Sequence, residues 1–398
     1  MAKVITTELQ HSGASGANIT LDSSKNVTAE NNLTVDGALT VTGTATLNGT
    51  VVGDNQRTQP FRNILINGDF RISQRNGTTS TAMTDGLYNI DRWCFVGASS
   101  RITTQQVEDG PTGFKYCMKA VSVGANTPDA ADALWYKLEG YDVKPLDYGT
   151  AGAVTTTLSF WFKASATGTY GGAIQKHDLA RSVPFSFTVS AADTWEKKTI
   201  TIPGDTTSST YRDTNLFSVS IKFSTGCASG YLDTAGTWVG SDKRGATGTV
   251  QIQATNAAYF SVTGIQWEIG STATDYEHKS YNDEFLACQR YFRKYGGAAA
   301  YQRVGIGYFS NTTRLECPLT LAPVMRTTPT MTVSDAGHWK AESPSGSGEF
   351  TAVGIDGNSS KEVAIIWGDK SSSFTAGESG RYLADNTTDA RIYLSAEL

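Results

Sequence analysis

Aromatic side chains in polar surroundings are the residues of this sequence with the clearest potential for chemistry. Flat aromatic faces stack on sugar rings, and nearby polar side chains bind the sugar hydroxyl groups. Trp238 and Trp339 each lie among Gly, Ser and Asp rather than in an apolar alternation, and Tyr301 and Tyr308 lie early in the last hundred residues. We therefore predict a carbohydrate-binding site that uses Trp238, Trp339, Tyr301 and Tyr308.

Other aromatic residues compete for this role or belong to a core, because large aromatic side chains dominate protein interiors. Three tryptophans lie in alternating strand patterns and are predicted to be buried: Trp93, Trp161 and Trp267. The wider set of binding candidates consists of Trp135, Tyr136, Tyr170, Tyr231 and Trp367.

Carboxylate pairs would support a different chemistry, the hydrolysis of a glycosidic bond by two acids across a groove. The residues that could supply such a pair are Glu139, Asp142, Asp147, Glu268 and Asp275. Solvated carboxylates are common on any protein surface, so we predict no catalytic residue and no enzymatic activity. Cleavage of a glycan remains the alternative.

Metal and nucleotide chemistry find little support in the sequence. The four histidines, at positions 11, 177, 278 and 338, are far apart, and neither a zinc-binding His-Glu-x-x-His motif nor a Cys/His cluster occurs. Gly305-Ile306-Gly307 lacks the third glycine of a nucleotide-binding loop, and no phosphate loop or nucleophile elbow is present. We predict that the protein uses no cofactor.

The elements that must position these residues begin with a repeat of six residues between positions 32 and 53. Asn32–Gly37, Ala38–Gly43 and Thr44–Gly49 each alternate apolar and polar residues and close on glycine, which predicts short strands joined by turns. Such strands bury little apolar surface alone and become stable when several copies share a core. We predict that residues 1–56 form an intertwined stalk of several identical chains, and that residues 56–60 are a linker.

The rest of the chain reads as two β-domains joined by one helix. Residues 57–280 are predicted to form a β-sandwich, with strands near 63–66, 92–96, 155–162, 185–189, 198–202, 217–223 and 264–269. Residues 281–398 contain a predicted helix at 282–294, capped by Asn282, with Phe285, Cys288 and Phe292 on one face. A small sandwich is predicted to follow, with strands near 301–309, 313–321, 328–333, 361–367 and 390–394. The fold class is therefore all-β.

Composition excludes several classes of partner. The 398 residues carry a net charge of -5 and no basic stripe, which argues against a nucleic-acid partner. No run approaches the roughly 20 apolar residues that span a bilayer, so we expect no membrane insertion. Met1-Ala2-Lys3-Val4 opens no apolar signal core, and we expect synthesis in a cytoplasm without a cleaved leader.

The five cysteines, at positions 94, 117, 227, 288 and 317, are an odd number without metal-ligand spacing. We expect buried free thiols. A Cys94–Cys117 bridge remains open.

Several motifs in order resemble the tail fibre or receptor-binding proteins of tailed bacteriophages. Val4–His11 and Ala17–Ser23 resemble the head of such fibres, and Asn63–Phe70 with Asp91–Trp93 is similar to the start of their jelly-roll module. Later matches to that module, to the junction after it and to the distal tip are Leu158–Ser165, Ile265–His278, Cys288–Phe292, Pro323–Thr330 and Ser395–Leu398. The jelly-roll module in turn looks like the carbohydrate-binding modules of polysaccharide-degrading enzymes.

The resemblance implies a homotrimeric virion component that is made in the host bacterial cytoplasm and adsorbs to host surface carbohydrate. It implies that the N-terminus attaches to a tail, baseplate or adaptor protein, and that the C-terminal sandwich is the receptor-binding tip. A structural calcium ion is an open alternative, because similar modules often hold one, although no Asp-x-Asp-x-Asp-Gly loop is present. The rival functions are a tail spike that depolymerises glycans and a free bacterial carbohydrate-binding module or lectin.

Overall fold

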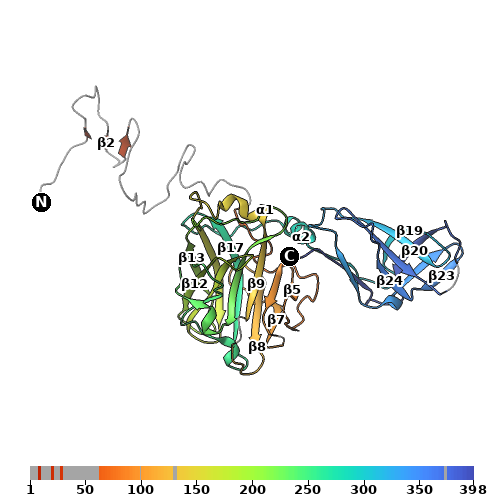
Figure 1. Cartoon of the computed structure of the whole chain (residues 1–398), viewed down its shortest axis with the longest axis horizontal. Helices are drawn as coiled ribbons and strands as arrows, with labels where there is room; N and C mark the ends of the chain where they lie inside the picture. Colours follow the sequence, from red (N-terminus) through yellow and green to blue (C-terminus); the bar gives the residue numbers. More distant parts are fainter. Residues whose placement is uncertain are drawn as a thin grey trace. The chain divides into compact units, whose positions relative to one another are not determined.

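The chain folds into two compact units, Met1–Gly53 and Asp54–Leu398. The computed structural model describes residues 8–9, 19–21, 27–29, 62–98, 100–128, 132–371 and 374–398. In the first unit, β1 (Glu8–Leu9), β2 (Ile19–Leu21) and β3 (Val27–Ala29) form an antiparallel sheet in the order β1-β2-β3. Figure 1 labels β2 of this sheet and several strands of the second unit. The predicted hexad repeats at 32–53 and the linker at 56–60 lie outside the described residues.

The second unit begins with two six-stranded sheets. The first has the order β13-β10-β17-β8-β7-β4 and the second the order β12-β11-β14-β9-β6-β5. Successive strands alternate between the sheets at several points, as in a jelly roll. The first sheet comprises β4 (Thr81–Ala82), β7 (Ile102–Val107), β8 (Cys117–Ser122), β10 (Thr156–Ala164), β13 (Glu196–Ile202) and β17 (Tyr259–Ile269). The second comprises β5 (Tyr88–Ile90), β6 (Trp93–Val96), β9 (Asp132–Glu139), β11 (Gly168–Lys176), β12 (Ser182–Val189) and β14 (Phe217–Gly226).

Short elements complete this domain. A short helix, α1 (Gly140–Val143), follows β9 and runs into a 3-10 turn at Lys144–Leu146. Two further 3-10 turns lie at Ser229–Tyr231 and Ile252–Ala254, and β15 (Leu232–Asp233) pairs in parallel with β16 (Gly245–Ala246).

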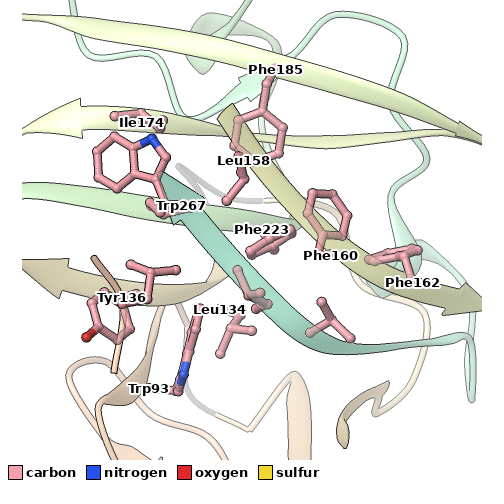
Figure 2. Packing of buried hydrophobic residues seen from close by; sticks show 14 of the residues in the cluster. Trp93, Leu134, Tyr136, Leu158, Phe160, Phe162, Ile174, Phe185, Phe223 and Trp267 are labelled. Atoms are coloured by element: carbon pink, nitrogen blue, oxygen red, sulfur yellow. The ribbon is translucent and has the colours of Figure 1, made fainter. Parts of the chain in front are cut away.

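An aromatic core fills the space between the two sheets. Figure 2 shows Phe160 of β10, Phe223 of β14 and Trp267 of β17 within one packed cluster, and Phe160 meets Phe223 edge to face at 5.0 Å. Trp93 and Trp267 are buried, as predicted. Trp161 was predicted to be buried as well, but it is only half-buried, because the strand period of two directs its neighbours into the core and Trp161 to the opposite face.

The predicted strand at 63–66 is absent from the described residues, where an irregular segment runs beside β17. The Asn63 side chain explains this, because its Oδ1 atom accepts hydrogen bonds from the backbone N atoms of Leu65 and Trp267, both at 3.1 Å. A side-chain acceptor thus replaces part of the backbone ladder. The other predicted strands of this domain are confirmed with small differences in their bounds.

The predicted helix exists but is shorter and begins earlier. Helix α2 spans Tyr281–Gln289, and its cap is Ser280, whose Oγ atom accepts from the backbone N of Asp283 at 3.1 Å. The prediction of Asn282 as cap was therefore wrong. Residues 292–294 belong to a strand, β18 (Phe292–Gly296), because this segment pairs antiparallel with the end of the chain, Phe292 opposite Ser395.

A second β-domain follows α2 and has its own core. A seven-stranded sheet has the order β23-β22-β26-β19-β20-β25-β24, and a three-stranded sheet has the order β18-β27-β21. Buried residues of both sheets form one cluster that includes Leu315, Trp339 and Ile392. The strands are β19 (Arg303–Phe309), β20 (Arg314–Thr320), β21 (Thr330–Val333), β22 (Trp339–Ser343), β23 (Gly346–Glu349), β24 (Ala352–Ile355), β25 (Val363–Asp369), β26 (Ser379–Ala384) and β27 (Arg391–Ser395), with a 3-10 turn at Ala336–His338. The all-β class is confirmed.

All five cysteines are buried thiols, as predicted, and Cys94 and Cys117 form no bridge. Burial raises the pKa of the Cys94 thiol to about 11. In the described part of the chain, the helices are too short or too polar to cross a membrane.

Candidate functional site

A polar pocket of about 400 Å³ lies in the second β-domain. Its walls come from three separate stretches: the β22–β23 hairpin with the residues after it, the two residues directly after β25, and the residue after β26. The lining residues are Lys340, Ser347, Gly348, Glu349, Phe350, Thr351, Lys370, Ser371 and Asp385. The volume and the mixture of hydroxyl groups, charges and an aromatic residue suit a small polar ligand.

Local strand geometry places Lys340 in the pocket wall. Along β22 the side chains alternate, with Trp339 and Ala341 buried and Lys340 and Glu342 directed to the other face. Lys340 stands opposite Glu349 of β23. Trp339 and Ala341 anchor one face of β22 in the core, and Lys340 therefore points from the other face toward the pocket.

Lys340 is held by two carboxylates and an aromatic ring. Its Nζ atom lies 3.2 Å from Asp385 Oδ1 and 3.5 Å from Glu342 Oε1. Burial opposes the charge, but the Asp385 hydrogen bond and the charges of Asp385 and Glu342 outweigh burial and raise the pKa of Lys340. The same ammonium lies 4.6 Å from the ring centroid of Tyr301, a cation–π contact. Lys340 thus stays a hydrogen-bond donor at neutral pH.

Tyr301 was predicted as a site residue, and it lies beside this pocket with 49% of its surface exposed. Its φ of 56° is a left-handed conformation that is uncommon outside glycine. A hydrogen bond from its backbone N to the Asp385 carbonyl oxygen, at 3.3 Å, ties it to a lining residue. Tyr301 can therefore offer ring surface next to fixed polar groups, and its role in glycan binding remains a prediction.

Lys370 is the second cation of the pocket. Its Nζ atom donates to the Ser347 carbonyl oxygen at 2.7 Å and lies 4.2 Å from the ring centroid of Phe374. Gly348 makes room for this arrangement, because a Cβ atom there would lie 2.0 Å from Lys370 Cε. Glycine at this position lets the lysine side chain cross β23.

Trp339 does not line a binding surface. It is 0% exposed and packs against Tyr382 in the core, with ring centroids 5.8 Å apart. The prediction of an exposed sugar platform at Trp339 is therefore wrong. The alternation of Trp339, Lys340 and Ala341 is the strand pattern that predicts a buried tryptophan. The polar residues that precede Trp339 in the sequence obscured this pattern.

Tyr308 is exposed, with 51% of its surface accessible, but it is separate from the pocket. Tyr308 stands opposite Ser379 of β26, whereas the backbone of Tyr301 bonds to Asp385, six residues further along the chain. Its Oη atom donates to Glu316 Oε2 at 3.1 Å, and Glu316 stands opposite the half-buried Trp367 of β25. The structure therefore leaves Tyr301 and Tyr308 apart, and Tyr308 belongs to an aromatic surface on the same sheet.

Trp238 is half-buried at the side of the first sandwich. Its Nε1 atom donates to the Pro203 carbonyl oxygen at 2.7 Å, and its ring packs edge to face on Tyr148 at 5.6 Å. These contacts hold the Trp238 ring in the first sandwich, whereas the pocket lies in the second β-domain. Its role in glycan binding remains a prediction. Among the wider candidates, Tyr136 and Tyr170 are buried, whereas Trp135, Tyr231 and Trp367 are half-buried.

The carboxylates considered for glycan hydrolysis are engaged in local interactions. Glu139 is buried, and its two oxygens accept from Arg290 at 2.9 and 2.8 Å. Burial, reinforced by the charge of Glu139, raises the pKa of nearby Asp142 to about 6. Glu268 accepts from Thr274 at its backbone N and its hydroxyl. Asp147 is exposed and accepts from a neighbouring threonine hydroxyl at 2.6 Å, and Asp275 is also exposed.

Among the described residues, no group of three or more His, Cys, Asp or Glu side chains is placed to bind a metal ion. The predicted absence of a cofactor, and the alternative of a structural calcium ion, remain predictions.

No protein family model matches the sequence, and no curated protein matches it. Solved structures with distant similarity include the enzymatically active domain of tailspike protein 4 of bacteriophage CBA120, at 11% identity and a TM-score of 0.31; the match covers 53% of this chain and 22% of that one. The CBM22-1 xylan-binding domain of Paenibacillus barcinonensis aligns at 8% identity and a TM-score of 0.27, over 50% of this chain and 99% of that domain. The family 11 carbohydrate-binding module of a Clostridium thermocellum cellulase aligns at 16% identity and a TM-score of 0.24, over 50% and 98%. Similarity this distant indicates no function, and the β-sandwich assignment rests on the strand pairing of the protein itself.

Proposed function

We propose that this protein is a non-enzymatic adhesin that binds carbohydrate through the pocket beside Tyr301, and that it is the receptor-binding tail fibre of a tailed bacteriophage. The observation that carries the binding proposal is the combination of a 400 Å³ polar pocket with an exposed tyrosine ring held next to Lys340 and Asp385. An ammonium and a carboxylate side by side can donate to and accept from neighbouring sugar hydroxyls, while the ring covers an apolar sugar face.

The phage role rests on the order of the sequence motifs that resemble tail fibres. The all-β architecture of two successive domains is compatible with that role. In this proposal the N-terminal unit attaches to the tail, and three copies of the chain present three pockets to one cell surface. Linked copies bind far more tightly than one site does, so weak single sites suffice for adsorption.

The absence of enzymatic activity is part of the proposal, and the carboxylate contacts support it. A glycosidase needs one acid that carries a proton and a second that is free to attack or to activate water. Glu139, the neighbour of the protonatable Asp142, has both oxygens occupied by Arg290. The rival reading of a depolymerase therefore requires another pair.

The binding proposal can be tested with an array of purified bacterial capsular polysaccharides and O-antigen chains. We expect the full chain to bind at least one of these glycans, and Tyr301→Ala to lower the affinity at least tenfold. The matched control is Tyr141→Ala, since Tyr141 is similarly exposed, at 59%, on α1. Binding to none of the glycans, or equal affinity of Tyr301→Ala and wild type, would contradict the proposal.

The same polysaccharides serve to test for cleavage. We expect no new reducing ends after prolonged incubation with the protein. Release of oligosaccharides would contradict the proposal and support the depolymerase alternative, whether or not Tyr301→Ala abolishes it.

A further inference from the structure

The pocket holds one cation that is fixed in position but not neutralised by the protein. Lys370 donates to a carbonyl oxygen, Ser347 O, at 2.7 Å, and the Phe374 ring lies 4.2 Å from its Nζ atom. Among the described residues, no carboxylate lies within ion-pair distance of Lys370, whereas Lys340 pairs with Asp385 and Glu342. A backbone carbonyl and a ring orient the ammonium without cancelling its charge.

The acidic residues that line the pocket do not neutralise Lys370. Asp385 is committed to Lys340 at 3.2 Å. Glu349 lines the same pocket but is exposed to solvent, where the high dielectric constant of water weakens its attraction to a nearby cation, and it stands opposite Lys340 across the β22–β23 pair. The pocket therefore presents Lys370 as its one oriented cation without an acidic partner in the described residues.

A cation that is held in position favours the binding of an anionic group. Charge-assisted hydrogen bonds from an ammonium to a carboxylate are about twice as strong as neutral ones. Because Lys370 is already held in place, less side-chain freedom is lost when a ligand binds. Ser347, Thr351 and Ser371 also line the pocket, and hydroxyl side chains suit the remaining sugar oxygens.

We propose that the ligand of this pocket is an acidic sugar whose carboxylate binds Lys370. In this arrangement, other sugar hydroxyls contact the Lys340–Asp385 pair and an apolar face of the sugar lies against Tyr301. This inference rests on the proposed glycan-binding function and adds the chemical class of the glycan.

Gly348 gives a test that leaves every charge in place. A Cβ atom at this position would lie 2.0 Å from Lys370 Cε and 2.2 Å from Nζ, so Gly348→Ala must displace the ammonium. The end of a lysine side chain moves at little cost, so the fold should persist. Gly357→Ala is the matched control, because a Cβ atom there meets nothing within 4 Å.

The experiment measures affinities of the full chain for alginate, polygalacturonate and hyaluronan, for the same polymers after reduction of their carboxylates, and for neutral dextran, mannan and xylan. We expect binding to at least one acidic polymer, loss of that binding on carboxylate reduction, and at least tenfold weaker binding by Lys370→Gln and by Gly348→Ala. Lys361→Gln, at an exposed lysine that does not line the pocket, and Gly357→Ala should bind as wild type. Circular dichroism and thermal unfolding establish that each variant is folded.

Each result separates the two proposals. Binding to neutral polymers alone, or acidic binding that Lys370→Gln and Gly348→Ala leave unchanged, would overturn the acidic ligand and leave the adhesin proposal standing. If neither these polymers nor the bacterial polysaccharide array showed binding, both proposals would fall.

Discussion

Glu397 lies 2.6 Å from Arg92, its Oε2 atom on Nη1, and joins the end of the second β-domain to the first. Arg92 is only 1% exposed, and its guanidinium also lies 3.5 Å from the Tyr291 ring centroid. Arg75 reaches the other oxygen of Glu397 at 3.0 Å. Arg75, Arg92, Tyr291 and Glu397 thus meet at the junction of the two domains, and Glu397 links the second domain to the first.

This junction predicts a large effect of Glu397→Ala on stability. The substitution leaves the buried charge of Arg92 without its carboxylate partner, which costs about 3–5 kcal/mol in comparable pairs. The free energy of unfolding, from urea titration monitored by tryptophan fluorescence, measures the loss. Glu108→Ala is the control, because the Glu108–Lys115 pair is exposed on both sides and exposed pairs contribute little. Equal stability of Glu397→Ala and wild type would contradict the junction as described.

Asp142 predicts a pH dependence. Its folded pKa of about 6 lies above the value of about 4 for an unfolded aspartate. The folded state therefore holds the proton more tightly, and ionisation destabilises the fold as the pH rises from about 4 to about 6; the penalty then persists at higher pH. Asp142→Asn removes the charge and should stabilise the protein by about 1–3 kcal/mol at pH 8 and by little at pH 4. Thermal unfolding at the two pH values measures this, and an equal effect at both would refute the assignment.

Substitution of Trp339 distinguishes a role in the core from a role in glycan binding. We expect Trp339→Phe to lower the free energy of unfolding by about 1–3 kcal/mol, because it opens space in a closely packed core. The same variant should bind glycan within twofold of wild type at a temperature where it is folded. A variant with native stability that had lost its glycan affinity would restore Trp339 as a binding residue.

The proposed homotrimer predicts a mass in solution. Multi-angle light scattering of the full chain should give three times the chain mass of 42.5 kDa. A mass of one chain across the micromolar range would argue for the free-lectin alternative and against the fibre.

The strands of both domains could be predicted from the sequence because their cores obey a simple period. Leu158, Phe160 and Phe162 alternate with other residues along β10, and all three are buried. The errors arose where a side chain competes with the backbone or where two elements compete for a segment. Asn63 replaces strand hydrogen bonds, and Phe292 belongs to β18 instead of extending α2.

The pocket itself could not be predicted from the sequence. Tyr301, which lies beside it, was chosen as a binding candidate, and its role remains a prediction. Lys340, Glu349, Lys370 and Asp385 are up to 45 positions apart and look like ordinary solvated charges. The pairing of β22 with β23 and with β26 brings Glu349 and Asp385 to Lys340. The contact of Lys370 with Ser347 brings the second lysine to the same place. An alternating pattern of charged residues along one strand does not show which charged side chains of other strands lie close to them in the fold.

Hydrogen–deuterium exchange of the full chain, with and without a polysaccharide that it binds, locates the glycan on the protein. We expect slower exchange on binding at the pocket, in residues 340–351 and 370–371, with little change along β9 and β14 of the first sandwich. Protection confined to the first sandwich, with the pocket segments unchanged, would contradict the proposed binding site.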